Sequence, residues 1–207
     1  MNPFAVEKAA AALLRLNLET QSHHATADQA WLSLQGRELT KWQYLRRLVA
    51  VYGFEAPLES ALAYTPHLPL LVDLRRRQRA GYIAQDLLAL GLSASEIAEL
   101  PQCVPMAPFS SALEALGWLY VSERETLLHD RIRTRVLEAM PDLRHATAYL
   151  SAYDGVVGAR WQELGAVIDR VVRSSRMLDE VIVAAHAAFR TWERWSRDDR
   201  ASHARFA

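Results

Sequence analysis

The chain has 207 residues, of which 51% are hydrophobic and 23% charged, and these are the values of a globular protein rather than a disordered one. Lysine plus arginine and aspartate plus glutamate each total 24, so the formal net charge is zero, and we expect no nucleic-acid partner because such proteins normally carry a basic excess. The single cysteine, Cys103, excludes an internal disulfide and a cysteine metal cluster.

Further classes are disfavoured by what the sequence lacks. Glycine-rich phosphate loops and the His-Glu-x-x-His and Gly-x-Ser-x-Gly motifs do not occur. No uncharged apolar stretch approaches the ~18 residues that span a bilayer. Glu7 and Lys8 stand among alanines without the apolar run of a secretory signal. We therefore expect a cytoplasmic protein without a membrane partner. The basic cluster over residues 75–79 is predicted to be the solvated face of a helix.

Apolar residues recur at three- and four-residue spacing in almost every segment, which predicts an all-α fold, and we expect one domain over residues 1–207. The first helix is expected from about Val6 to Leu34 and is broken at Gly36. The second helix begins at Thr40 and reaches about Ala61, with an irregularity at Pro57.

A third helix is expected from roughly Leu71 to Leu90, and Gly91 would end it as a C-terminal cap. Ser93 and Glu96 have the spacing of a capping box, which predicts a short helix. The segment that follows is predicted to be irregular because it contains three prolines, Pro101, Pro105 and Pro108.

Ser111 and Glu114 repeat the capping-box spacing and are predicted to open a long helix that ends before Pro141. Further helices are predicted near residues 142–153, around Trp161 and Leu164, and from about Ser175 to Trp195. The tail after about residue 197 is polar and is expected to fray.

His24 lies in the middle of the first predicted helix. At about 100° per residue, the same side carries small, apolar and polar residues and one carboxylate: Leu13, Asn17, Thr20, Ala27, Asp28 and Trp31. A neutral imidazole among such neighbours can coordinate iron, and a carboxylate on its other nitrogen would fix its tautomer. Taken alone, a histidine on a mixed helix face is more often structural or exposed.

The segment from Leu16 to Asp28 resembles the first helix of the heme oxygenase family. That family has a leucine, a threonine, the proximal histidine and a carboxylate at four-residue intervals, matched here by Leu16, Thr20, His24 and Asp28. The resemblance implies a heme oxygenase-like multi-helix bundle in which His24 is the axial ligand of the heme iron. It implies that Asp28 supports that ligand, and that Thr20 and Asn17 also line the heme site.

The segment from Ala115 to Glu123 is similar to the distal heme helix of bacterial members of the family. Their pattern reads Ala-Leu-Gly-x-Leu-Tyr-Val-x-Glu-Gly-Ser and is followed shortly by Leu-Gly-Gly. Gly117 and Tyr120 are kept in this chain. The three later glycines are replaced, by Arg124, Leu128 and His129.

These replacements change a face that contacts the porphyrin in the family. Gly117, Tyr120, Arg124 and Leu128 share one side of the predicted helix. In the family, glycines on that side let the backbone approach the porphyrin. With the side chains of Arg124 and Leu128 there, we expect either that the distal helix stands further off or that the pocket is altered or partly closed. Glu125 takes the position of the residue that helps hold distal water, and the resemblance makes it the expected catalytic carboxylate.

The resemblance implies an oxidoreductase of the bacterial, biliverdin-producing type. It would bind heme (iron protoporphyrin IX) as both substrate and cofactor, with the iron held by His24, and open the ring to biliverdin, carbon monoxide and iron. The reaction would use dioxygen and external electrons, with a ferredoxin or a flavin reductase as donor. The cofactor supplies most of this chemistry, while the protein supplies orientation and hydrogen bonds.

Three other interpretations remain open at this point. The lost glycines favour a catalytically impaired protein of the same fold that binds or senses heme, with Arg124 or His129 on the distal side. A non-heme di-iron protein would use Glu125 and His129, spaced i,i+4, together with His24, and Asp142-x-x-His145 is the one hint of a second ligand pair. A domain without cofactor that serves as an interaction module is the fourth, since fold similarity alone decides none of them.

Overall fold

Helices account for the regular structure of the described residues, which are 3–36, 38–103 and 106–202 of a computed structural model, and no strand occurs among them. Side chains are described within these ranges from residue 11 to residue 197. The all-α, single-domain prediction is confirmed. The α-helices are α1 (Pro3–Glu19), α2 (Gln21–Leu32), α3 (Lys41–Ala63), α4 (Leu68–Leu71), α5 (Ala80–Ala89), α6 (Ala94–Ala98), α7 (Ala112–Glu125), α8 (His129–Ala139), α9 (Ala148–Ser151), α10 (Val157–Val171) and α11 (Ser175–Ser202).

The first predicted helix is broken in the structure, at Thr20. The Thr20 hydroxyl donates to the carbonyl of Leu16 at 2.8 Å, and α2 starts afresh at Gln21. A threonine hydroxyl that bonds back onto the preceding turn competes with the helical pattern and bends the helix. The 3-10 helix η1 (Ser33–Gln35) then follows α2. The prediction of one continuous helix was wrong, but His24 lies within α2 as expected.

Local capping signals placed three helix starts correctly, one of them at Ser111, which accepts from the backbone N–H of Glu114 at the start of α7. Thr40 accepts from the backbone N–H of Gln43, and the Gln43 side chain accepts from the Thr40 N–H, so the predicted start of α3 is confirmed. The same reciprocal arrangement links Ser93 and Glu96 at the start of α6. Pro57 lies inside α3 without ending it.

Three predicted helices differ from the structure. The third is divided into α4, the 3-10 helix η2 (Leu74–Arg77) and α5, although Gly91 does follow α5 with φ +107°. The long helix before Pro141 is interrupted by the 3-10 helix η3 (Thr126–Leu128), where the Thr126 hydroxyl donates to the Glu123 carbonyl at 2.7 Å. The last helix, α11, continues past residue 197 to Ser202.

Two further short elements lie after α8. The 3-10 helix η4 (Pro141–Ala146) and α9 occupy the region in which one short helix was predicted. Asp86 of α5 accepts the backbone N–H groups of Ala148 and Tyr149 at 2.7 and 2.9 Å, so this carboxylate caps α9. Burial nevertheless raises the pKa of Asp86 to about 6.

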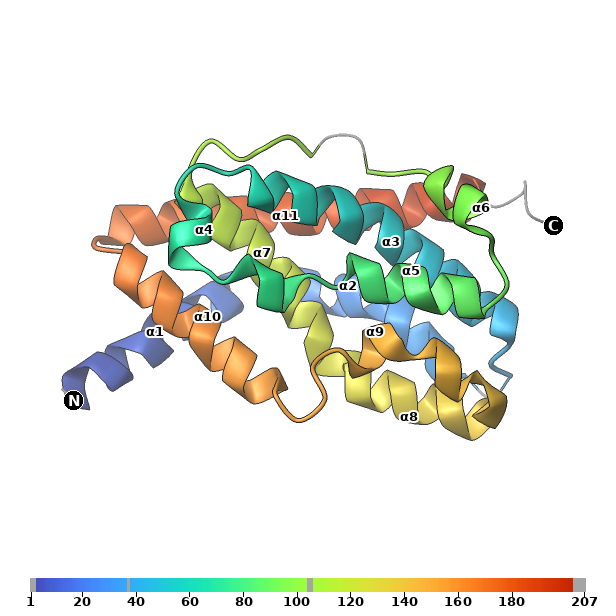
Figure 1. Ribbon diagram of the computed structural model, residues 1–207. Coiled ribbons are helices and arrows are strands. Elements are labelled where there is room, and N and C mark those ends of the chain that lie inside the picture. Colours follow the sequence, from blue (N-terminus) through green and yellow to red (C-terminus); the bar gives the residue numbers. More distant parts are fainter. Residues whose placement is uncertain (1–2, 37, 104–105, 203–207) are drawn as a thin grey trace.

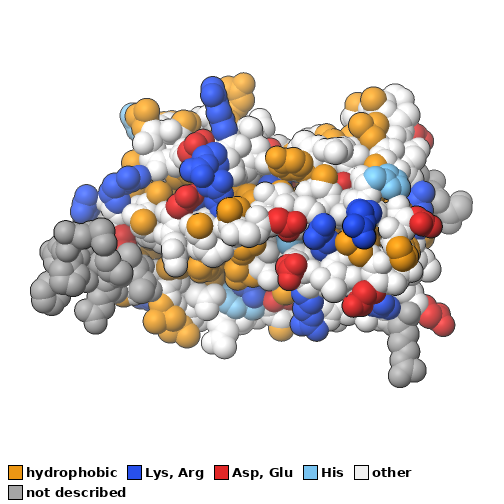
Figure 2. Space-filling view, turned by 60° about the horizontal axis from the view of Figure 1, so that its bottom comes forward, with side chains coloured by type: hydrophobic (Ala, Val, Ile, Leu, Met, Phe, Trp, Pro, Cys, Tyr) orange, Lys and Arg blue, Asp and Glu red, His pale blue; other side chains and the backbone are white. Residues whose placement is uncertain are grey.

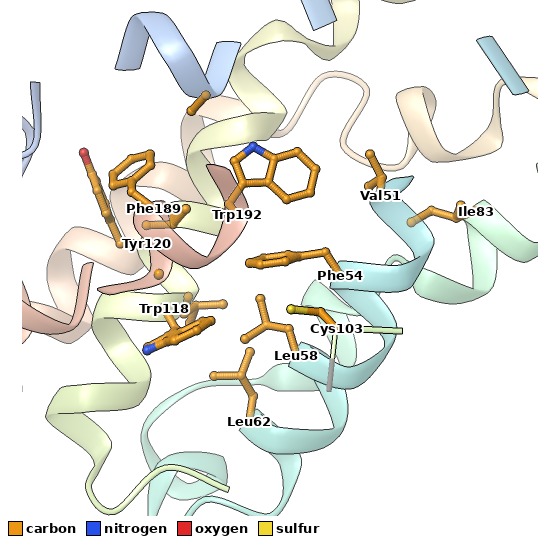
Figure 3. Close-up of a cluster of buried hydrophobic side chains, with 14 of the residues drawn as sticks. Val51, Phe54, Leu58, Leu62, Ile83, Cys103, Trp118, Tyr120, Phe189 and Trp192 are labelled. Atoms are coloured by element: carbon orange, nitrogen blue, oxygen red, sulfur yellow. The ribbon is translucent and has the colours of Figure 1, made fainter. Parts of the chain in front are cut away.

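The pairing of α7 with α11 is the most extensive helix contact of the bundle, and α3 packs against both. Figure 1 shows α3, α7 and α11 running through the molecule, with α5 beside α3 and α10 beside α1. In the core between them, Phe54 and Leu58 of α3 meet Trp118 of α7 and Phe189 and Trp192 of α11 (Figure 3). The ring centroids of Phe54 and Trp192 are 4.9 Å apart.

Gly117 lets α7 approach α11 closely. A Cβ atom at this position would lie 2.5 Å from the carbonyl oxygen of Val181 and 2.7 Å from the backbone nitrogen of Ala185. Both neighbours are backbone atoms in the middle of a helix, and neither can move without shifting α11. The glycine therefore sets the distance between the two central helices.

We predict that Gly117→Ala lowers the free energy of unfolding by about 1–3 kcal/mol, because the added methyl group forces the two helices apart. Gly158→Ala is the matched control, since a Cβ at Gly158 of α10 meets nothing within 4 Å. It should be neutral or slightly stabilising. Urea denaturation measures both effects, and equal stabilities for the two variants would contradict the close approach.

Candidate functional site

His24 lies on α2 in a chain of hydrogen bonds that reaches α7. Its Nε2 atom is 3.2 Å from the hydroxyl of Thr20, which in turn is 3.1 Å from the hydroxyl of Tyr120. The Tyr120 hydroxyl also donates to the side-chain oxygen of Asn17 at 3.3 Å. Thr20 and Tyr120 are fully buried. The structure thus brings His24 together with three predicted site residues, Asn17, Thr20 and Tyr120.

Arg124 joins α7 to α2 directly. Its guanidinium donates two hydrogen bonds to the Asp28 carboxylate, at 2.6 and 2.9 Å. The two side chains are 13% and 18% exposed, so most of this ion pair is shielded from solvent. A bidentate pair of this kind is stronger and more directional than an ordinary surface ion pair. Arg124 and Asp28 therefore hold the two helices in direct contact, one turn along α2 from His24.

The environment keeps His24 uncharged. Partial burial, followed by the nearby positive charge of Arg124, lowers the pKa of His24 to about 4, against an opposing effect of Asp28. A histidine with this pKa is a neutral imidazole at pH 7, which is the form that binds a metal ion. Its ring is tilted against Phe189 of α11 at a centroid distance of 5.7 Å.

Glu125 is buried behind Arg124. It accepts hydrogen bonds from the indole of Trp31 and from Arg47, whose guanidinium is 3.3 Å away and lies between the rings of Trp31 and Trp192. Burial raises the pKa of Glu125, and Arg47 opposes this shift. A void of about 20 Å³ lies between α2, α3, α7 and α11, and both Glu125 and Arg124 line it. That volume holds roughly one water molecule.

The other residues expected on the distal side lie in different surroundings. Gly117 faces α11, as described above, and its role toward a ligand remains a prediction. Leu128 is partly buried and packs against the hydrophobic core. His129 is 2% exposed and packs against the stacked rings of Trp31 and Tyr149, with neither of its nitrogens in a hydrogen bond. Burial lowers the pKa of His129 well below its ordinary value.

A buried network of charges beside this site was not predicted. Arg79 is 1% exposed and donates to Glu55 at 3.1 Å, and it also contacts Glu123 and Ser122. Arg77 donates to Glu123 at 2.6 Å. Although burial alone would lower it, the charges of Glu55 and Glu123 raise the pKa of Arg79 well above its ordinary value.

The prediction of a solvated helix face over residues 75–79 was therefore wrong for Arg77 and Arg79. These two residues leave the surface because Glu55 of α3 and Glu123 of α7 neutralise them inside the bundle. Glutamates at core-facing positions of two predicted helices were the available signal, since a buried carboxylate requires a partner. The Tyr153 hydroxyl completes the network by donating to Glu123 at 2.8 Å.

The described residues give no geometric support to a di-iron site. No group of three or more histidine, cysteine, aspartate or glutamate side chains within 3–36, 38–103 and 106–202 is placed to hold a metal ion. Glu125 faces Trp31 and Arg47, while the His129 ring packs against Trp31 and Tyr149. In the same part of the chain, no helix combines the length and apolar character needed to cross a bilayer.

The face of the molecule in Figure 2 carries charges of both signs. Figure 2 shows acidic and basic side chains interspersed with apolar ones over the face in view. This distribution agrees with the equal totals of acidic and basic residues in the sequence. The contacts between α2, α7 and α11 therefore remain the best-defined candidate site.

We predict that the imidazole of His24 remains mostly neutral at pH 5, because its pKa is about 4. NMR of the ring Cε1–H group between pH 8 and pH 5 measures this. In Arg124→Gln the pKa should rise toward 6.5, since a nearby positive charge is lost and Asp28 is left unpaired.

The sign for stability follows from the same shift. A pKa that is lower in the folded protein makes protonation favour unfolding, so the contribution of His24 to stability is complete above pH 6.5 and is lost as the pH falls toward 4. An unshifted titration of His24 near pH 6.5 in the unmodified protein would show that Arg124 and the surrounding helices do not enclose it.

We predict that His129→Phe raises the free energy of unfolding by about 1–2 kcal/mol. The substitution removes two buried nitrogens that lack hydrogen-bond partners and keeps an aromatic ring against Trp31 and Tyr149. Tyr153→Phe is the contrasting variant and should destabilise, since it deletes a hydroxyl that is bonded to Glu123. Urea denaturation compares them. A loss of stability in His129→Phe would mean that the imidazole has a partner in solution.

Comparison with known proteins gives the same grouping as the sequence motifs. The chain matches the heme oxygenase family over residues 10–198, which is most of its length. A comparison with curated proteins found no match to the chain. The matched range contains both the His24 helix and the helix that carries Arg124. By this match, the chain belongs to the heme oxygenase family.

Proposed function

We propose that this protein is a catalytically impaired member of its family, in which the ion pair between Arg124 and Asp28 closes the site that the family uses for heme. Heme then reaches His24 weakly, and only when this ion pair breaks. The observation that carries the proposal is the bidentate contact between the two helices, which spans the space that a porphyrin would need.

The void at the Arg124–Asp28 ion pair is much smaller than a pocket that holds an organic ligand such as heme. Pockets that enclose an organic ligand have volumes of roughly 300–1,000 Å³. The void lined by Asp28 and Arg124 measures about 20 Å³, and His24 is not part of its wall. The hydroxyls of Thr20 and Tyr120 also lie only 3.1 Å apart, so the facing helices touch at a second point. Both observations favour a site in which a porphyrin has no room between α2 and α7.

Two larger cavities have walls without His24, and the smaller of them, about 280 Å³, shares Ala27 and Trp192 with the 20 Å³ void. One of about 350 Å³ is lined by residues of η1, α2, α3 and α11, among them Gln29, Gln43 and Arg46, and His24 is not part of its wall. The neutral His24 imidazole therefore suits an iron ligand. The small void at Asp28 and Arg124, in contrast, favours a site that is closed to a porphyrin.

The proximal side nevertheless keeps the properties of an iron ligand. His24 is neutral, Thr20 is within hydrogen-bond distance of its Nε2 atom, and Asp28 follows one turn later. In this chain Asp28 binds Arg124 in two hydrogen bonds, so its carboxylate is already engaged. Breaking the ion pair would free both the carboxylate and the space that Arg124 fills.

A heme oxygenase that produces biliverdin, carbon monoxide and iron is the second candidate function. The retained group of Thr20, His24 and Asp28 favours it, as does Glu125, which lines the small void with Arg124 and could hold a water there. This candidate requires dioxygen and electrons from a ferredoxin or a flavin reductase. Against it, the Glu125 side chain is 14% exposed and already accepts bonds from Trp31 and Arg47.

Hemin titration tests the closed site. We predict weak binding by the unmodified protein, followed by its Soret band, and about tenfold tighter binding in Arg124→Ala, as expected when one ion pair no longer has to break. His24→Ala should abolish the Soret shift, whereas His23→Ala should leave it nearly intact. Arg176→Ala is the matched control, because Arg176 of α11 is 90% exposed and only pairs with Glu180.

Tight hemin binding that is indifferent to Arg124→Ala would contradict the closed site. Equal behaviour of His23→Ala and His24→Ala would contradict the assignment of the ligand. Reduction of the hemin complex under air then separates the two candidates. Release of biliverdin and iron by the unmodified protein would favour the oxygenase, while an unbleached complex agrees with impaired turnover.

A further inference from the structure

His23, the neighbour of His24, belongs to a separate cluster between α2 and α11. Its Nε2 atom is 3.0 Å from Nδ1 of His186, and its Nδ1 atom is 2.8 Å from a carboxylate oxygen of Glu193. Both contacts come from one face of α11, because positions 186 and 193 are two helical turns apart. The side chains of His23 and Glu193 are 16% and 15% exposed.

The His23 ring is held in place by a buried aromatic side chain of α11. It stacks on Phe189 with a centroid distance of 5.1 Å and an interplanar angle of 5°, and Phe189 is 1% exposed. With Glu193 on one nitrogen and a buried ring beneath it, His23 has little rotational freedom. Its Nε2 atom is therefore held toward His186.

We propose that His23 and His186 form a binding site for a divalent transition-metal ion of the zinc type, with Glu193 as the carboxylate that orients His23. Imidazole nitrogens on tetrahedral zinc, at bond lengths of ~2.0–2.1 Å, lie about 3.3 Å apart. The two nitrogens here are already 3.0 Å apart, so an increase of a few tenths of an ångström accommodates the ion. The proton that now lies between them, on Nδ1 of His186, moves to the Nε2 atom of the same ring, so both rings bind the metal as neutral imidazoles.

The position of Glu193 matches a known role of carboxylates around metals. Histidine ligands usually donate their second ring N–H to a carboxylate, which fixes the tautomer and makes the ligating nitrogen more basic. Glu193 accepts from Nδ1 of His23 in this way and leaves Nε2 for the metal. Because no third described side chain is placed to bind the same ion, water would complete the coordination.

Titratable and charged groups from α1, α2 and α11 surround His186. Partial burial, then His23 and Arg190, lower the pKa of His186, whereas Glu19 of α1 raises it. The lowered pKa keeps His186 neutral and able to coordinate. Glu19 and Glu193 are acidic, Arg190 is basic, and Arg15 pairs with Glu19, so acidic and basic groups balance around the site. The site does not depend on whether heme binds, since it uses neither His24 nor α7.

Titration of the untagged full-length protein with Zn²⁺, in competition with a chromogenic chelator, tests the proposal. One equivalent should bind, and His23→Ala or His186→Ala should each weaken it at least tenfold. Glu193→Gln should weaken it by about 10- to 100-fold, as is typical when a carboxylate behind a ligand is lost. His145→Ala and His24→Ala are the controls and should bind as the unmodified protein does, with folding of each variant checked by circular dichroism.

A second measurement identifies the ligands without relying on affinity. In the Cu²⁺-loaded protein, electron paramagnetic resonance should show two coupled nitrogens, and one in His186→Ala. Absence of Zn²⁺ binding by the unmodified protein would overturn the proposal. Binding that survives both His23→Ala and His186→Ala, or that is lost in His24→Ala alone, would overturn it equally, because the ion would then lie elsewhere.

Discussion

The ion pair between Arg124 and Asp28 is the contact on which the arrangement of this site depends. It joins the helix that carries His24 to the helix that faces it, through two hydrogen bonds that are largely shielded from water. In the proposed function, Arg124 both fills the space beside Asp28 and binds its carboxylate. The shift of the His24 pKa to about 4 reports the same enclosure.

A second constraint lies deeper in the bundle. Arg77 and Arg79 are buried against Glu55 and Glu123, and Arg47 is buried against Glu125, so three helices are held in register by paired charges rather than by apolar packing alone. Removing one partner of such a pair leaves an uncompensated charge inside the protein, which costs far more than the pair contributes. These pairs fix α7 against α3 and against the segment before α5, so α7 is a rigid wall on its side of the site.

The sequence was sufficient for features that arise within a few residues of each other. Helix starts at Thr40 and Ser93 follow from side chains that cap their own helix, and the register of Thr20, His24 and Asp28 follows from helical spacing. Helix breaks at Thr20 and Thr126 were missed because periodicity does not show whether a hydroxyl bonds back to the main chain. The partners of Arg124 and Arg79 could not be predicted either, since they lie on other helices, and spacing along one helix does not show which neighbour covers it.

The closure of the site is tested most directly by a double-mutant cycle that combines Arg124→Gln with Asp28→Asn, measured as free energies of unfolding in urea. If the two side chains bind each other as the structure shows, the loss in the double variant is smaller than the sum of the single losses by at least about 1 kcal/mol. Additive losses, within about 0.5 kcal/mol, would contradict the account. Arg124 would then not be bound to Asp28 in solution, and the space beside His24 would be open to a ligand.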